Sequence, residues 1–109
     1  MTRRSIGIIV DTESGVITYT DTAKRAHRGD EIQWECQAGP FALQFTGATP
    51  VEFQGNRSTR RKGDEAHVLT GVVRENAVAG VYQYGCAVYA GDRVYLDARC
   101  PVIIIDLDV

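Results

Sequence analysis

The chain has 109 residues, 44% of them hydrophobic, and a formal net charge of −2. This length predicts one domain over residues 1–109, with enough apolar side chains for a core. The charge gives no basic field for nucleic acid or anionic lipid, and no apolar stretch is as long as a membrane span. The run Ile6–Val10 is too short for a secretion signal, so we expect a cytoplasmic protein whose three cysteines are free thiols.

Short apolar or alternating runs recur along the chain, separated by glycine, proline and acidic turns. This pattern is typical of an all-β sandwich or barrel, and no segment shows a convincing helical period. In chain order, the predicted strands are Ile6–Val10, Val16–Thr20 resuming as Ala23–His27, Glu31–Cys36, Phe41–Phe45, Val51–Phe53, Ala66–Val73, Val81–Tyr89, Arg93–Leu96 and Pro101–Leu107.

Alternation along a strand predicts which side chains point inward. In the strands Glu31–Cys36 and Phe41–Phe45, the expected inward set is Ile32, Trp34, Cys36, Phe41, Leu43 and Phe45. By contrast, the run Val102–Ile105 has no alternation, which suits a central strand covered on both sides. Residues 47–64 form the longest loop-like stretch.

The strand that contains Gly80–Cys86 carries alternating tyrosines and ends on a cysteine. Its period of two separates two sets of side chains. One face is expected to hold Tyr82, Tyr84, Cys86 and Val88, and the other Val81, Gln83, Gly85, Ala87 and Tyr89.

Three segments resemble cupredoxin motifs in the right order. Arg28–Trp34 resembles the early turn and strand of that family, Gly39–Phe45 resembles the segment with the first copper histidine, and Gly80–Cys86 resembles the strand that ends on the copper cysteine. The resemblance implies a Greek-key β-sandwich of about seven to eight strands.

The departures from the family pattern fall on the copper ligands. Phe41 stands where the first histidine is expected, and neither histidine nor methionine follows Cys86. A blue-copper centre needs two imidazoles and a thiolate. The resemblance places His27 at the pole opposite the copper, and His67 begins a separate strand. We therefore expect no copper, no other metal and no cofactor.

An immunoglobulin-like sandwich is the alternative fold. Tyr84, two residues before Cys86, also fits the tyrosine corner of that fold. However, that family expects a first cysteine and then a tryptophan on the next strand. Here Trp34 precedes Cys36 on the same strand, so the cupredoxin-like interpretation is preferred.

Cys36 and Cys86 carry the main chemical alternative. The resemblance places the two thiols near one another at the copper pole, where a pair could form a regulatory disulfide or bind a soft metal. The simpler interpretation is that both are small buried hydrophobic side chains. Cys100 adds nothing specific.

A basic cluster lies within residues 56–62 and consists of Arg57, Arg60, Arg61 and Lys62. Clustered arginines suit phosphate or an acidic partner. The absence of interleaved aromatic residues disfavours nucleic acid, and the acidic residues at 64 and 65 predict partial neutralisation. The alternative is a solvated loop.

Tyr89 and Tyr95 flank a predicted hairpin turn that contains Asp92. Tyrosines beside a turn serve either recognition or packing across the hairpin. The other late carboxylates, Asp97, Asp106 and Asp108, form no acid–base pair, and no serine, cysteine or histidine lies in a nucleophile context. We therefore expect no enzyme.

Together, the sequence predicts a non-catalytic, copper-free cupredoxin-like module for binding or assembly. The expected partner is a protein, including a second copy bound through an edge strand or a tyrosine-bearing face. The first candidate surface combines residues 37–41 with 86–92, including Phe41, Tyr89 and Asp92, and the second is the basic cluster.

Overall fold

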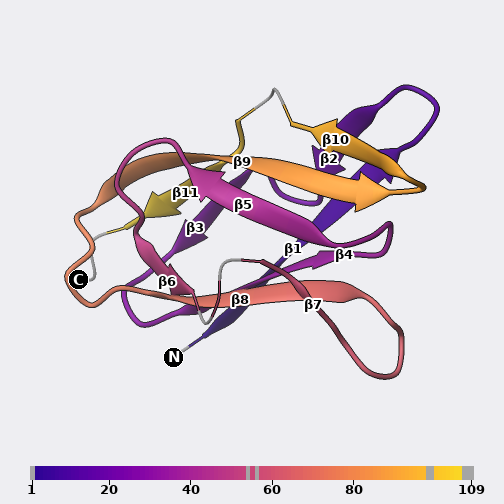
Figure 1. Ribbon diagram of the computed structural model, residues 1–109. Helices are drawn as coiled ribbons and strands as arrows, with labels where there is room; N and C mark the ends of the chain where they lie inside the picture. The colour runs from indigo at the N-terminus through magenta and orange to yellow at the C-terminus, as the bar shows by residue number, and fades with distance from the viewer. Residues whose placement is uncertain (1, 54, 56, 98–99, 107–109) are drawn as a thin grey trace.

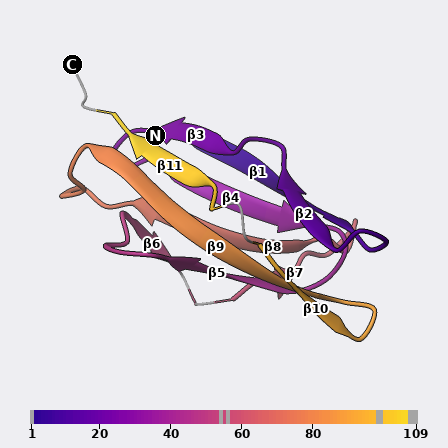
Figure 2. The same ribbon diagram turned by 90° about the horizontal axis from the view of Figure 1, so that it is seen from above.

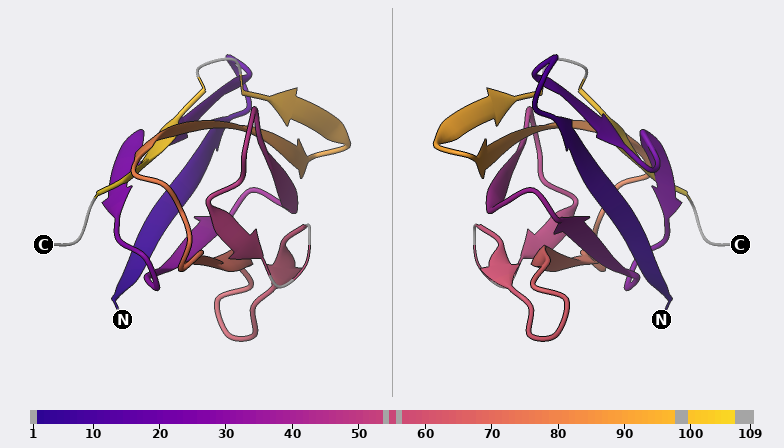
Figure 3. Two further views of the ribbon diagram at one scale, coloured as in Figure 1. Left: turned by 90° about the vertical axis from the view of Figure 1, so that its left-hand side faces the viewer. Right: turned by 90° about the vertical axis from the view of Figure 1, so that its right-hand side faces the viewer.

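The structure is a computed structural model that describes residues 2–53, 55, 57–97 and 100–106. These residues contain eleven strands and no helix, and the strands form two mixed sheets that pack face to face (Figures 1 and 2). Seen from either end, the strands surround a common interior (Figure 3). The predicted all-β sandwich is confirmed.

The first sheet has β4 near its centre. Its order is β2 (Val16–Tyr19), β1 (Arg3–Asp11), β4 (Glu31–Cys36), β8 (His67–Val73) and β6 (Val51–Phe53), with the short β7 (Thr59–Arg60) also paired to β8. Most neighbours are antiparallel, but β1 runs parallel to β4.

The second sheet is built around β9 (Gly80–Ala90), whose eleven residues make it the longest strand described. One edge of β9 pairs in succession with β10 (Arg93–Leu96) and β11 (Val102–Ile105), and its other edge pairs with β5 (Phe41–Phe45). The sheet then continues from β11 to β3 (Ala23–Ala26), which runs parallel to it.

The predicted strand positions agree closely with the structure, but the predicted number is too low. Eleven strands are described, whereas the resemblance implied seven to eight, because β2 and β3 are separate strands and the short β6 and β7 add to the number. The break at residues 20–22 sends β2 and β3 into different sheets. The two-residue β7 lies inside the predicted loop 47–64. The end of the predicted strand Pro101–Leu107 falls outside the described residues.

The core contains a cluster of aromatic rings from both sheets. Trp34 and Tyr84 are fully buried, with ring centroids 5.8 Å apart in an edge arrangement. Phe45 and Phe53 pack around them. The predicted inward set is confirmed, with Leu43 only half-buried.

β11 is an internal strand, as its apolar run predicts, because it lies between β9 and β3. Ile103 and Ile105 are buried in the core, whereas Val102 and Ile104 are half-buried on the outer side. The expectation that both sides are covered is therefore wrong. No described segment of the chain lies over the outer face of this sheet, so these side chains stay partly exposed (Figure 2).

Asp30 joins the N-terminal strand to the turn between β3 and β4. Its buried carboxylate accepts hydrogen bonds from Arg4 Nε at 2.9 Å and from the backbone amides of His27 and Thr2 at 2.9 and 3.3 Å. Burial alone would raise the pKa of Asp30, but these hydrogen bonds and the Arg4 charge outweigh it and hold the pKa below its usual value.

We predict that Asp30→Asn destabilises the fold by about 2 kcal/mol, since it removes a buried charge pair and leaves Arg4 without its counter-charge. A folded-state pKa below the unfolded value of 3.8 gives stability that is present above that pH and is lost as pH falls through the folded pKa. In Asp30→Asn, the free energy of unfolding should therefore fall less steeply as the pH is lowered. Urea unfolding from pH 2 to pH 7 measures both effects, with exposed Glu13→Gln as the control. If the free energy of unfolding of Asp30→Asn falls as steeply at low pH as that of the unmodified protein, the prediction is contradicted.

Candidate functional site

The surface predicted first, residues 37–41 with 86–92, is only partly a surface. Phe41 is 3% exposed and lies in the core, opposite Val88 on β9. The connection before it is held close to β9 by Gly39, where a Cβ would lie 1.9 Å from the carbonyl oxygen of Tyr89. The Phe41 side chain is therefore part of the packing at this end of the sandwich and is not displayed to a partner.

Tyr89 and Asp92 do come together on the β9–β10 hairpin. Tyr89 is 49% exposed, and its hydroxyl donates a hydrogen bond of 3.2 Å to Asp92 Oδ1. Asp92 has a positive φ of 63°, a turn conformation that aspartate tolerates better than most residues. The pair is an exposed aromatic side chain held in place by the turn that follows it.

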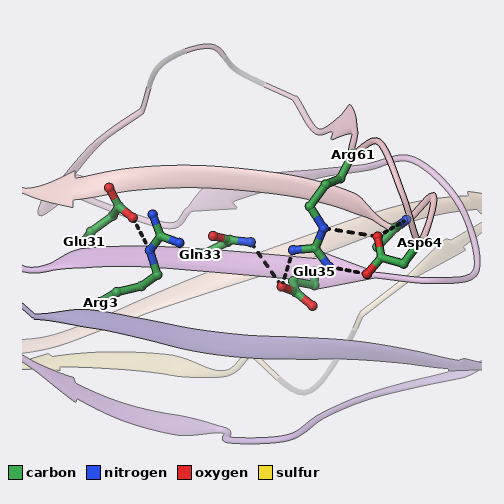
Figure 4. A network of polar contacts seen from close by, with 7 residues as sticks. Arg3, Glu31, Gln33, Glu35, Arg61 and Asp64 are labelled. Carbon is green, nitrogen blue, oxygen red and sulfur yellow. Dashed lines mark hydrogen bonds and ion pairs between the residues drawn. The ribbon is translucent and has the colours of Figure 1, made fainter.

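The basic cluster lies at the first sheet, and two of its four members, Arg60 and Arg61, form ion pairs. Arg61 donates to Glu35 Oε1 at 2.7 Å and to Asp64 Oδ1 at 3.1 Å (Figure 4). Arg60 forms an ion pair with Glu65. The hydrogen bonds with Arg61 lower the pKa of Asp64 to about 2. The two remaining members, Arg57 and Lys62, are exposed.

These contacts belong to a set of polar contacts along the outward side of β4 in the first sheet (Figure 4). Arg3 Nε donates to Glu31 Oε1 at 2.5 Å, and Gln33 Nε2 donates to Glu35 Oε1 at 3.0 Å. Glu35 is shared between Gln33 and Arg61. The outward side chains of β4 are therefore satisfied by neighbours from the same chain.

Cys36 and Cys86 lie in the core as free thiols and are 1% and 5% exposed. Burial raises the pKa of Cys86 to about 12, with further contributions from nearby Cys36 and Asp97, although a hydrogen bond with Tyr19 acts in the opposite direction. Nucleophilic attack and soft-metal binding both require the thiolate. At neutral pH this environment keeps Cys86 protonated.

The histidines are separated from one another. His27 lies beside Asp30 at the β3–β4 turn, and His67 stands opposite Cys36 where β8 begins. Within the part of the chain that the structure describes, no group of three or more histidine, cysteine, aspartate or glutamate side chains is placed to hold a metal ion.

The outer face of the second sheet has a different composition from that of the first. Of the six large apolar side chains that are most exposed in the described chain, four lie here: Val81 at 65%, Tyr89 at 49%, Val94 at 63% and Leu96 at 72%. We call this surface the apolar face, and it comprises the outward residues of β5, β9, β10 and β11: Ala42, Gln44, Val81, Gln83, Gly85, Ala87, Tyr89, Val94, Leu96, Val102 and Ile104.

A groove of about 680 Å³ crosses the apolar face between β5 and the β10–β11 edge. Its floor consists of small outward residues on neighbouring strands, Ala42, Gly85 and Ala87, and Leu96 forms part of its wall. Cys86 and Cys100 also reach the lining. The floor is low because no long side chain stands on the middle of β9.

Sequence reasoning placed Val81, Gln83, Gly85 and Ala87 with Tyr89 on one face of the strand and selected Tyr89 as a site residue, but it missed that β5, β10 and β11 extend this face. The available signal was the apolar character of residues at outward positions: Val94 and Leu96 on either side of buried Tyr95, and Val102 and Ile104 in the run without alternation. Each strand alone reads as ordinary packing. Only the pairing of β10 and β11 with β9 gathers these residues on one surface.

We found no match to this chain among protein-family models or among curated proteins. The residues that the structure describes include no helix long and apolar enough to cross a membrane.

Thiol reactivity tests the core placement of the cysteines. We predict that about one thiol, Cys100, reacts with DTNB in the native protein at pH 8, because Cys100 is half-buried whereas Cys36 and Cys86 are buried. All three should react after unfolding. In Cys100→Ser, the native protein should give almost no reaction. Loss of the Cys36 and Cys86 thiols together on mild oxidation, reversed by reductant, would contradict the prediction and favour redox chemistry.

Proposed function

We propose that this chain is a non-catalytic, copper-free, cupredoxin-like module that binds a protein partner through the apolar face. The observation that carries the proposal is the gathering of Val81, Tyr89, Val94 and Leu96 on one exposed surface. Single exposed apolar residues are ordinary on soluble proteins, whereas a contiguous patch is typical of an interaction site.

The half-buried outer residues of β11 support the same proposal. Val102 and Ile104 lie beside Gln83 and Val81 on β9, so they extend the exposed patch across three neighbouring strands. An uninterrupted apolar strand is usual where a sheet is covered on both faces. A bound protein would supply the second cover.

The cupredoxin-like part of the proposal has independent support. Phe41 and Cys86 come from β5 and β9, which pair with each other, so the positions of the first copper histidine and the copper cysteine fall on neighbouring strands. With phenylalanine in one position and no histidine or methionine in residues 87–97, the ligand set is replaced by core packing. We propose a cytoplasmic location, where reducing conditions keep the thiols free.

A thiol-based redox or soft-metal function is the second candidate. One observation favours it, namely that Cys36 lies close enough to Cys86 to contribute to the raised pKa of Cys86. The burial of both thiols and that high pKa oppose it. It therefore ranks behind the binding function.

Copper titration tests the metal-free part of the proposal. We expect that Cu(II), added to the reduced protein, produces no intense visible absorption of a copper–thiolate bond, because Phe41 offers no ligand and Cys86 is protonated in the core. Phe41→His is the informative companion variant, since it introduces one ligand type on β5, the strand that pairs with the Cys86 strand. An intense band in the unmodified protein would overturn this part of the proposal.

Crosslinking from the apolar face tests the binding function. With a photo-reactive residue at Val94, we expect protein adducts in the native host, and we expect none from Thr18, which is on the outer face of the first sheet. Because Val94 is 63% exposed, substitution there should change the free energy of unfolding by no more than about 0.5 kcal/mol. Absence of any adduct from Val94, in a variant shown to be folded, would refute the proposed function.

A further inference from the structure

We propose that the partner of the apolar face is a second copy of this chain, so that two second sheets pack face to face around a two-fold axis. The inference rests on the proposed function and identifies its partner. Three properties of the face carry it: complementary relief, charge balance and size.

The relief of the apolar face is suited to self-association. A two-fold contact joins a surface to itself, so one face must provide both the projecting and the receiving groups. Leu96 projects with 72% of its surface exposed, and the groove beside it has the low floor of Ala42, Gly85 and Ala87. Leu96, Ala87 and Ala42 even lie in one row across three strands. Leu96 of one copy can therefore enter the groove of the other.

Gly85 indicates that something closely approaches the middle of β9. A glycine inside a strand weakens it, and it is commonly kept where another group comes close. At Gly39 and Gly71 a Cβ would lie 1.9 Å and 2.3 Å from atoms of the same chain, which explains glycine there. At Gly85 a Cβ would meet nothing within 4 Å. No described part of the chain requires this glycine, whereas close packing of a second sheet would.

The charges around the apolar face are balanced at both ends. None of its own residues is charged. At one end Arg25 pairs with Asp106 at 2.7 Å, and at the other end the hairpin carries Asp92 and Arg93. At the groove wall, the Asp97 carboxylate accepts a hydrogen bond of 2.6 Å from the Tyr19 hydroxyl. Each of these two ends has one acid and one base, so a strongly charged partner gains no attraction there.

The size of the face suits a small two-fold interface. With eleven residues, β9 is about 36 Å long at roughly 3.3 Å per residue, and the face is two to three strands wide, which at about 4.8 Å per strand is roughly 10–14 Å. The flat area is then roughly 350–500 Å², and protruding side chains increase the accessible area. Standard interfaces bury about 800 Å² on each partner.

Sedimentation equilibrium of the purified chain tests the proposal. We expect the unmodified protein to have twice the mass of its 12.0 kDa chain at micromolar concentration. Gly85→Glu and Leu96→Glu should weaken dimerisation by about 30-fold or more, because each places a charge in the interface twice. Reductant is present throughout, so a disulfide bond between two copies cannot account for a dimer. Thr18→Glu adds the same charge to the first sheet and should remain dimeric.

The outcomes separate this inference from the proposed function. A Cβ at position 85 has open space, so the melting temperature of Gly85→Glu should match that of the unmodified protein. A Gly85→Glu variant that is folded and monomeric then supports the proposal. A dimer that persists in both folded glutamate variants overturns it, since the interface lies elsewhere. A monomeric unmodified chain also overturns it. If that monomer still crosslinks from Val94 to a different protein, the proposed function survives; if it gives no adduct, both fail.

Discussion

The contact between Trp34 and Tyr84 is the constraint on which both layers of the sandwich depend. Trp34 comes from β4 of the first sheet and Tyr84 from β9 of the second, and both are fully buried. The indole Nε1–H donates to the Tyr84 hydroxyl at 3.3 Å, so neither polar group is left unpaired in the core. Because this contact joins the middle strands of the two sheets, it fixes how one layer lies on the other.

The same contact also determines what faces outward. Side chains alternate along a strand, so with Tyr84 inward, Gly85 and the other odd-numbered residues of β9 must point away from the core. A shift of one residue would exchange the two sets. Pairing then places Leu96 and Ile104 on the same outer surface. The buried core and the apolar face are thus two consequences of one register.

The sequence was most informative where one strand alone decides the outcome. Alternation located Glu31–Cys36 and its inward side chains, and the local hairpin brought Tyr89 to Asp92. It was least informative where distant segments pair, because a short strand such as Thr59–Arg60 forms only on β8. Phe41 illustrates a conflict within the sequence argument: alternation placed it inward, while the copper-pole comparison suggested a surface role, and the structure has it 3% exposed.

The two outer faces differ because the middle strands of the two sheets carry different side chains. On β4, Glu31 and Glu35 pair with Arg3 and Arg61, whose long side chains lie along the strand. On β9, the central outward positions are glycine and alanine, which attract no such cover, and the neighbours are apolar. Any group that covers β9 must therefore come from outside the described chain. A surface with low relief in the middle and apolar projections beside it favours an apolar partner of complementary relief.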